Sequence, residues 1–291
     1  LHPRVRRQRQ MCIRDRIEAK TITQEVSRLC IEAATCIEAD VLNALRKAAR
    51  TETGLSQRIM EQILENDILA QTEDIPMCQD TGITIVFVEI GNEVHIDGDL
   101  NEAIHQGVAD GYTRGYLRKS VVSSPLNRKN TQNNAPAIIH IRFTVGSELK
   151  ITVCPKGAGS ENMSRVKMLV PADGIPGIKK FVCDTVLEAG GRACPPLIVG
   201  VGIGGDLEKS ALLAKEALLR PVEDSALDTE VKSLEDELLK EINALNIGPM
   251  GLGGKTTAMA VKINTYPCHI ASLPVAVNLQ CHASRHKAVI L

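Results

Sequence analysis

Hydrophobic residues recur at helical spacing in the first quarter of the chain. Between Thr21 and about Glu73 they fall three or four positions apart, which is the period of one helix face. Asp40 and Ser56 stand where the N-terminal caps of helices are expected. The pattern predicts three consecutive helices, which form a helical N-terminal layer.

The pattern changes after Ile75-Pro76, where β-branched residues dominate from 83 to 88. Gly91-Asn92 favours a turn into a second strand at 94–96, so we expect a hairpin. A second pair of strands is predicted at 137–145 and 148–154. Further strands are predicted at 197–203, 259–263 and 270–277, and helices at 101–119, 160–169, 175–189, 207–219 and 228–245. The fold class is mixed α/β, a helical N-terminal layer followed by a mixed β-sheet flanked by helices.

Composition narrows the function classes. The chain has 34 Lys and Arg against 35 Asp and Glu, with three Tyr, three Phe and no Trp, so it lacks the basic and aromatic surface of a nucleic-acid binder. Its longest apolar stretches fall short of the roughly 20 residues that cross a bilayer, so no membrane partner is expected. Nine cysteines without a C-x-x-C pair indicate reduced thiols and a cytoplasmic location.

Residues 1–16 differ from the remainder of the chain, because they hold six Arg and a single acid. They resemble an Arg-rich transit peptide, but also the translation of a sequencing adapter read through into a gene. We interpret them as a non-native leader and expect 17–291 to be a single domain.

Three glycine-rich segments resemble sites that bind nucleotides or small anions. The residues Gly200, Gly202 and Gly205 fit G-x-G-x-x-G between a strand and a helix, but no second strand with an acidic ribose ligand follows, so a tight strand-to-helix turn is favoured over a dinucleotide site. The segment Gly251–Thr257 resembles a phosphate loop with broken spacing. Lys156-Gly-Ala-Gly-Ser160 enters a predicted helix and could hold a small anion such as a carboxylate.

Three cysteines differ from the others in their surroundings. Cys78, Cys194 and Cys281 lie at junctions between predicted elements, among polar residues, glycines or prolines. Three thiolates from remote loops would suit a 4Fe-4S cluster with one open iron. His282 and His286 are spaced by one helical turn, but the glutamate of a zinc motif is absent, so surface histidines are the favoured interpretation.

Seven short motifs occur in one order along the chain. They are Cys78-Gln-Asp-Thr-Gly82, Tyr116-Leu-Arg-Lys-Ser120, Asn133-Asn-Ala-Pro136, Lys156-Gly-Ala-Gly-Ser-Glu-Asn162, Cys194-Pro-Pro196, Gly251-Leu-Gly-Gly-Lys-Thr-Thr257, and Ala271-Ser-Leu-Pro274 continuing to Cys281-His282. Together they resemble the α subunit of two-subunit class I fumarate hydratases, the iron–sulfur fumarases. The α subunit of L(+)-tartrate dehydratase shares most of them.

The resemblance implies a hydro-lyase that hydrates fumarate reversibly to (S)-malate, a reaction of the tricarboxylic acid cycle. It implies that a 4Fe-4S cluster is held by Cys78, Cys194 and Cys281, with the open iron as Lewis acid. By the same similarity, substrate contacts come from Gln79 and Arg118, and from backbone N–H groups at Gly157 and Gly159. Asp80 and His269 match active-site positions and are the candidate catalytic residues, with a residue of the partner as an equal candidate for the group that removes the proton. Without the resemblance, Arg118 would be a helix-end cation and His269 a polar loop residue.

The resemblance also implies a partner. The family's active site is completed by a second domain or a separate β subunit, and this chain stops ten residues after Cys281, so we expect a hetero-oligomer and an inactive isolated chain. Tartrate dehydration to oxaloacetate is the alternative within the class. A cluster-free subunit that binds an anion is the alternative outside it.

Overall fold

The computed structural model describes residues 16–291, so the predicted leader lies outside the described residues except for Arg16. This part of the chain divides into two compact units, each assembled from separate stretches. The first comprises residues up to Cys36 together with Ala70–Gly157 and Arg285–Leu291, and the second comprises Ile37–Leu69 and Ala158–Ser284. Because no single linker separates the units, the sequence gives no sign of the division. That 17–291 behaves as a single domain stays a prediction.

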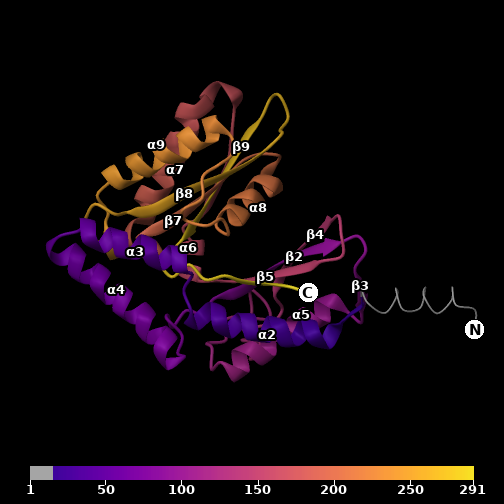
Figure 1. Ribbon diagram of the computed structural model, residues 1–291. Coiled ribbons are helices and arrows are strands. Elements are labelled where there is room, and N and C mark those ends of the chain that lie inside the picture. Colours follow the sequence, from indigo (N-terminus) through magenta and orange to yellow (C-terminus); the bar gives the residue numbers. More distant parts are fainter. Residues whose placement is uncertain (1–15) are drawn as a thin grey trace, which may run out of the picture. The chain divides into compact units, whose positions relative to one another are not determined.

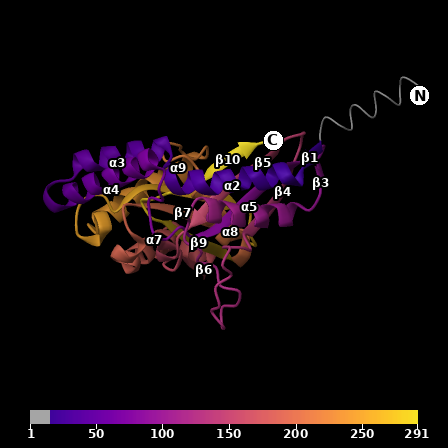
Figure 2. The same cartoon turned by 90° about the horizontal axis from the view of Figure 1, so that it is seen from below.

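The first unit is a mixed sheet with two helices packed on one face. The helices are α2 (Ala19–Thr35) and α5 (Leu100–Arg114), and they lie side by side (Figure 1, Figure 2). The sheet has the order β10-β5-β2-β4, in which only β2 and β4 run parallel. Its strands are β2 (Ile83–Gly91), β4 (Ile138–Thr144), β5 (Leu149–Lys156) and β10 (Lys287–Ile290), and a small separate pair is formed by β1 (Arg16–Glu18) and β3 (His95–Asp97).

The pairing in this sheet corrects two expectations. β2 does not form a hairpin with the next strand, because its two edges are occupied by β4 and β5 and β3 pairs with β1 instead. The turn after Gly91 exists, with the Val94 N–H donating to the Gly91 carbonyl at 3.0 Å. β4 and β5 do not pair with each other, since β2 lies between them. β10 was not predicted.

The second unit has a sheet of the same mixed type, with the order β6-β9-β7-β8 and only β7 and β8 parallel. Its strands are β6 (Arg165–Leu169), β7 (Leu197–Gly204), β8 (Ala258–Tyr266) and β9 (Leu273–Gln280). Its helices are α3 (Ala39–Thr51), α4 (Gly54–Glu73, of which the residues from Ala70 on belong to the first unit), α6 (Ala158–Glu161), α7 (Gly174–Ala189), α8 (Leu207–Ala217) and α9 (Thr229–Ala244), with 3₁₀ turns η1 (Pro171–Asp173), η2 (Gly190–Ala193) and η3 (Pro249–Gly251). The class, mixed α/β, is as predicted.

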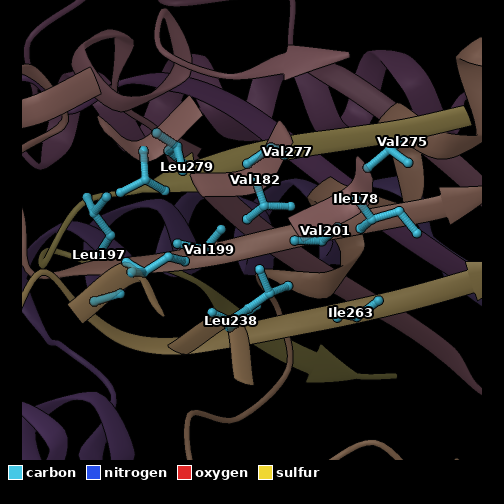
Figure 3. Packing of buried hydrophobic residues seen from close by; sticks show 14 of the residues in the cluster. Ile178, Val182, Leu197, Val199, Val201, Leu238, Ile263, Val275, Val277 and Leu279 are labelled. Carbon is cyan, nitrogen blue, oxygen red and sulfur yellow. The ribbon is translucent and has the colours of Figure 1, made fainter. Parts of the chain in front are cut away.

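Valines and glycines alternate along β7, so the two faces of this sheet pack against different helices. Val199 and Val201 face the same buried cluster as Val182 of α7 and Leu238 of α9 (Figure 3). The intervening glycines of β7 face α8, because a Cβ added at Gly202 would lie 2.0 Å from the Ser210 carbonyl oxygen. Each buried Val or Leu contributes roughly 1.5–3 kcal/mol by leaving water, so the apolar face anchors the strand that leads out of the Cys194 turn.

Three local expectations in the second unit are wrong. Residues 160–169 do not form one helix, because α6 ends at Glu161 and β6 pairs antiparallel with β9. Asp40 is not an N-cap: it lies inside α3 after the capping position Glu38, and its carboxylate accepts the Val222 N–H at 2.7 Å. Ser56 lies inside α4. For residues 165–169, pairing with β9 has overridden local propensity.

Within the described residues, no helix is both long enough and apolar enough to cross a bilayer.

Candidate active site

The motif Cys78-Gln-Asp-Thr-Gly82 forms the loop that leads into β2 in the first unit. Its start is fixed by the Met77 N–H, which donates to the Ala34 carbonyl at 3.0 Å. Its end is fixed by the buried Tyr112 hydroxyl, which donates to the Thr81 carbonyl at 2.6 Å. Burial raises the pKa of Tyr112, so the phenol stays a neutral donor at physiological pH. The loop is therefore held by the helix layer at both ends.

Within this loop, the Asp80 side chain accepts a hydrogen bond from the Gly82 N–H at 3.1 Å. Gly82 has φ +78°, and a Cβ there would lie 2.6 Å from the Lys156 carbonyl carbon, so only glycine fits this turn. Asp80 is partly buried while Gln79 is exposed. Both predicted roles are compatible with these positions.

A second loop in the same unit is joined to the first by two hydrogen bonds, and a third hydrogen bond closes the second loop on itself. The Thr81 hydroxyl donates to the Arg118 carbonyl at 2.7 Å. The fully buried Asn134 accepts the Ser120 N–H at 2.7 Å and donates to the Gly82 carbonyl at 3.2 Å. The Arg118 side chain itself is exposed. The structure thus places the loops of Gln79, Asp80 and Arg118 together. Their roles in substrate binding stay predictions.

Asn134 and Arg285 hold the loops of the candidate site, and the sequence motifs predicted a role for neither. Asn134 lies within the motif Asn133-Asn-Ala-Pro136. Arg285 is 2% exposed, and its Nη1 donates to the Asp80 carbonyl at 2.7 Å. A Cβ at Gly157 would lie 3.1 Å from Asp80 Oδ2 and 3.3 Å from Arg285 Nη2. Gly157 therefore borders the Asp80 loop.

In the second unit, Cys194 lies in a turn between η2 and β7. It has left-handed backbone geometry, φ +55°, and the following Pro195-Pro196 bond is cis. The Pro195 carbonyl accepts the Met250 N–H at 2.8 Å. A Cβ at Gly251 would lie 2.4 Å from the Gly191 Cα, so the glycine-rich loop packs closely on the cysteine turn.

Cys281 follows β9 directly and adjoins this turn. The His282 N–H donates to the Cys194 carbonyl at 3.3 Å, and the Gln280 side-chain amide donates to the Cys281 sulfur at 3.6 Å. Two predicted ligands far apart in sequence are therefore neighbours within one unit. Cys78 belongs to the other unit, so the convergence of all three thiols stays a prediction. In the described chain, no three His, Cys, Asp or Glu side chains form a metal-binding group.

The donor chemistry of the three thiols fits a cluster better than that of Cys30 and Cys183. Cys78, Cys194 and Cys281 are each partly exposed and free of disulfides. Burial raises the pKa of Cys30 to about 12 and that of Cys183 to about 11, so those thiols stay protonated and are poor ligands. The Gln280 amide that donates to the Cys281 sulfur resembles the N–H donors found at the sulfurs of iron–sulfur sites.

The remaining predicted residues lie in the second unit. His269 is exposed in the loop between β8 and β9, and its Nδ1 accepts the Ala271 N–H at 3.1 Å. Gly159 is exposed in α6. His282 and His286 do not share a helix turn, since the segment between β9 and β10 is irregular; both are partly buried. The roles of His269 and Gly159 stay predictions.

The two nucleotide-like motifs have structural explanations. A Cβ at Gly200 would lie 2.2 Å from the Ala214 carbonyl oxygen, so the glycines of β7 admit α8 at close range. Asp206 caps α8 by accepting the Lys209 N–H at 2.8 Å, which places a negative charge where a phosphate would bind. The loop at Gly251–Thr257 binds the buried Glu52 through its backbone N–H groups. Both contacts indicate that these glycine-rich segments are tightly packed turns and not nucleotide-binding loops.

Comparison with known proteins places the chain in one class of enzymes, the hydro-lyases. The sequence model of the fumarate hydratase (fumerase) family matches residues 23–290, and the chain belongs to this family. It is 44% identical over 272 residues to the putative L(+)-tartrate dehydratase subunit alpha of Methanocaldococcus jannaschii, covering 91% of this chain and 95% of that protein. It is 30% identical over 274 residues to the L(+)-tartrate dehydratase subunit alpha of Escherichia coli K12, covering 93% and 90%. The resemblance inferred from the motifs is confirmed.

Proposed function

We propose that this chain is the α subunit of an iron–sulfur hydro-lyase that interconverts fumarate and (S)-malate. The observation that carries the proposal is the adjacency of Cys194 and Cys281, two predicted ligands joined through the His282 N–H and the Cys194 carbonyl. A buried structural cysteine pair would not need partly exposed thiols with an amide donor on one sulfur. Family membership supports the same reaction class.

Cys78, Cys194 and Cys281 would hold a 4Fe-4S cluster. When bound, the cluster supplies an iron with a free coordination position, which acts as a Lewis acid toward an oxygen of the substrate. The protein's contribution is the side-chain amide of Gln280, whose N–H donates to the Cys281 sulfur and stabilises the thiolate charge.

The substrate would be held by the joined loops of the first unit. The exposed Arg118 guanidinium binds one carboxylate of the dicarboxylate through its fork of donors, and the Gln79 amide contacts the substrate beside it. Gly157 and Gly159 offer backbone N–H groups. Asp80 and His269 are the candidates for moving the proton next to the carboxylate. Asp80 is fixed by the Gly82 N–H, which restricts where its carboxylate points.

The site is completed, in our proposal, by a β subunit in a cytoplasmic hetero-oligomer. The names of the relatives, each a subunit alpha, support a two-subunit enzyme. We therefore expect the isolated chain to lack activity. Full turnover by the isolated chain would contradict this part of the proposal.

The test is anaerobic reconstitution of the full chain with iron and sulfide. We expect about four irons per chain and visible absorption in the wild type, and loss of both in Cys78→Ser, Cys194→Ser and Cys281→Ser. Cys183→Ser is the matched control, because this partly buried thiol lies on α7 outside the predicted ligand set. Retention of the cluster in the three variants would overturn the ligand set. Failure of the wild type to take up iron would favour the cluster-free anion-binding subunit.

Tartrate dehydration to oxaloacetate is the second candidate, favoured by the names of the two relatives described above. The two candidates differ in substrate and not in ligand set. Parallel assays of fumarate, (S)-malate and L(+)-tartrate with the reconstituted α–β complex decide between them. A kcat/KM for tartrate at least about tenfold above that for malate, a difference of about 1.4 kcal/mol in transition-state binding, would select the second candidate.

A further inference from the structure

Arg285 is a buried cation to which neither the motifs nor the proposed function assigns a role. It is 2% exposed, and its Nη1 donates to the backbone carbonyl of Asp80 at 2.7 Å. Both residues belong to the first unit. The acceptor lies two residues after Cys78 and one after Gln79, so the hydrogen bond falls on the segment that carries a predicted ligand and two predicted site residues.

A buried guanidinium is an expensive way to stabilise a fold. Removing a cation from water costs several kcal/mol unless its donors are satisfied, and well-packed apolar residues often stabilise the same place better. Within the described residues, Nε of Arg285 is buried and has no hydrogen-bond partner. Stability alone would favour an apolar residue at this place, whereas a guanidinium can hold the Asp80 carbonyl.

Gly157 shows how closely the loop and the guanidinium are fitted. A Cβ at this position would lie 3.1 Å from Asp80 Oδ2 and 3.3 Å from Arg285 Nη2. Such contacts are tighter than ordinary side-chain packing, so a larger residue would displace the carboxylate, the guanidinium or both. Close packing at Gly157 thus restrains both the Asp80 carboxylate and the Arg285 guanidinium, and the guanidinium in turn holds the Asp80 carbonyl.

We propose that Arg285 is a positioning residue for the active site: its buried guanidinium fixes the backbone at Asp80 and so sets the orientation of the Cys78–Gly82 loop. It does not bind substrate, because the side chain is enclosed. The proposal rests on the proposed function for its catalytic consequence but not for the restraint itself. Arg285 itself lies four residues after Cys281 in the sequence, and its hydrogen bond is to the loop that carries Cys78.

The restraint is tested by hydrogen–deuterium exchange on the full chain, without iron or partner. In Arg285→Met we expect exchange of the peptide covering 77–82 to rise at least about tenfold, since a charged hydrogen bond to its backbone is lost. Arg285→Lys retains one donor for the Asp80 carbonyl and should recover part of the protection. The matched control is Arg28→Met, which removes a half-exposed guanidinium bonded to Glu25 and Glu32 in the same unit.

Unchanged exchange in a folded Arg285→Met chain would overturn the proposal. Should that variant fail to fold, Gly157→Ala replaces it, because the added Cβ disturbs the same contacts while keeping the arginine. For Gly157→Ala we expect the same local rise in exchange, and protection equal to the wild type would count against the proposal.

The catalytic consequence is tested in the reconstituted α–β complex, with rates expressed per bound cluster. We expect Arg285→Met to lower kcat about 100-fold with KM changed by less than about threefold, because small displacements of a reacting group affect the chemical step most. Arg285→Lys should restore at least about a tenth of the wild-type kcat. Faster exchange with an unchanged kcat would show a purely structural role and would overturn the proposal. Absence of activity in the wild-type complex would contradict the proposed function while the exchange result stands.

Discussion

The Glu52 carboxylate accepts the backbone N–H of Thr256 at 2.6 Å and the N–H of Lys255 at 2.9 Å. These are the amides that a phosphate would take in a phosphate loop. The carboxylate is 4% exposed, and Gly254 lets it approach, since a Cβ there would lie 2.9 Å from Glu52 Oε2. The glycine-rich loop therefore holds an internal anion and fixes the segment that packs on the Cys194 turn.

Replacing Glu52 by alanine should destabilise the chain by about 2–4 kcal/mol, because two backbone N–H groups lose a charged acceptor that lies in a buried position. Urea unfolding followed by far-UV circular dichroism measures the difference. Glu65→Ala, at an exposed position of α4, is the control and should change the free energy of unfolding by less than about 0.5 kcal/mol. A loss below about 1 kcal/mol in Glu52→Ala would show that the loop is held by other contacts.

Gly202→Ala should be among the most destabilising single-methyl substitutions in the second unit. Its Cβ would lie 2.0 Å from the Ser210 carbonyl oxygen and 2.6 Å from the Ala214 backbone nitrogen. Because backbone atoms cannot rotate away, we expect a loss of about 3 kcal/mol or more. Gly190→Ala is the control: nothing lies within 4 Å, so only the strain of its glycine-type backbone (φ +51°, ψ −136°) is added, about 1–3 kcal/mol. Equal Tm values for the two variants would contradict the close-packing explanation.

Most elements of this fold could be predicted from the sequence, because their signals are local. The period of apolar residues located α2, α3 and α9, and the glycine after α7 marked its end. The pairing of strands could not be predicted. Residues 165–169 read as helix in isolation, and their strand geometry comes from pairing with β9, more than a hundred residues away in the chain.

In the candidate site, too, some residues could be predicted from local sequence and others could not. Asp80 and Arg118 were found through their motifs, and the structure joins their loops. Arg285 and Glu52 carry no local signal, because what distinguishes them is burial and a partner about 200 residues away in the sequence. A charged residue in a loop is exposed far more often than buried, so only the three-dimensional contacts reveal the two that are not.

Asp67 makes the stability of the chain depend on pH. It is 1% exposed, and burial raises the pKa of its carboxyl from 3.8 to about 6. The folded state therefore holds this proton more tightly than the unfolded state. The contribution of Asp67 to the free energy of unfolding is highest below about pH 4, where the carboxyl is protonated in both states, and it decreases as the pH rises through 6. Two pKa units correspond to about 2–3 kcal/mol.

We therefore expect Asp67→Asn to stabilise the chain by about 2 kcal/mol at pH 8 and to have little effect near pH 4. Urea unfolding at several pH values between 4 and 8 measures the change. Glu65→Gln on the same helix accounts for the general effect of removing one negative charge. A stability difference between wild type and Asp67→Asn that is constant with pH would contradict the raised pKa.

Activity of the α–β complex should be lost in air and restored by ferrous iron and thiol without oxygen. The reason lies in the predicted ligand set: three thiols leave one iron without a protein ligand, and such an iron is open to oxidants as well as to substrate. The measurement follows fumarate hydration and iron content through exposure and anaerobic repair. The matched comparison is the free energy of unfolding, because Cys30 and the other core residues of the first unit lie in buried apolar clusters that oxygen does not attack. Retained turnover after complete loss of iron would show that catalysis does not depend on the cluster and would overturn that part of the proposed function.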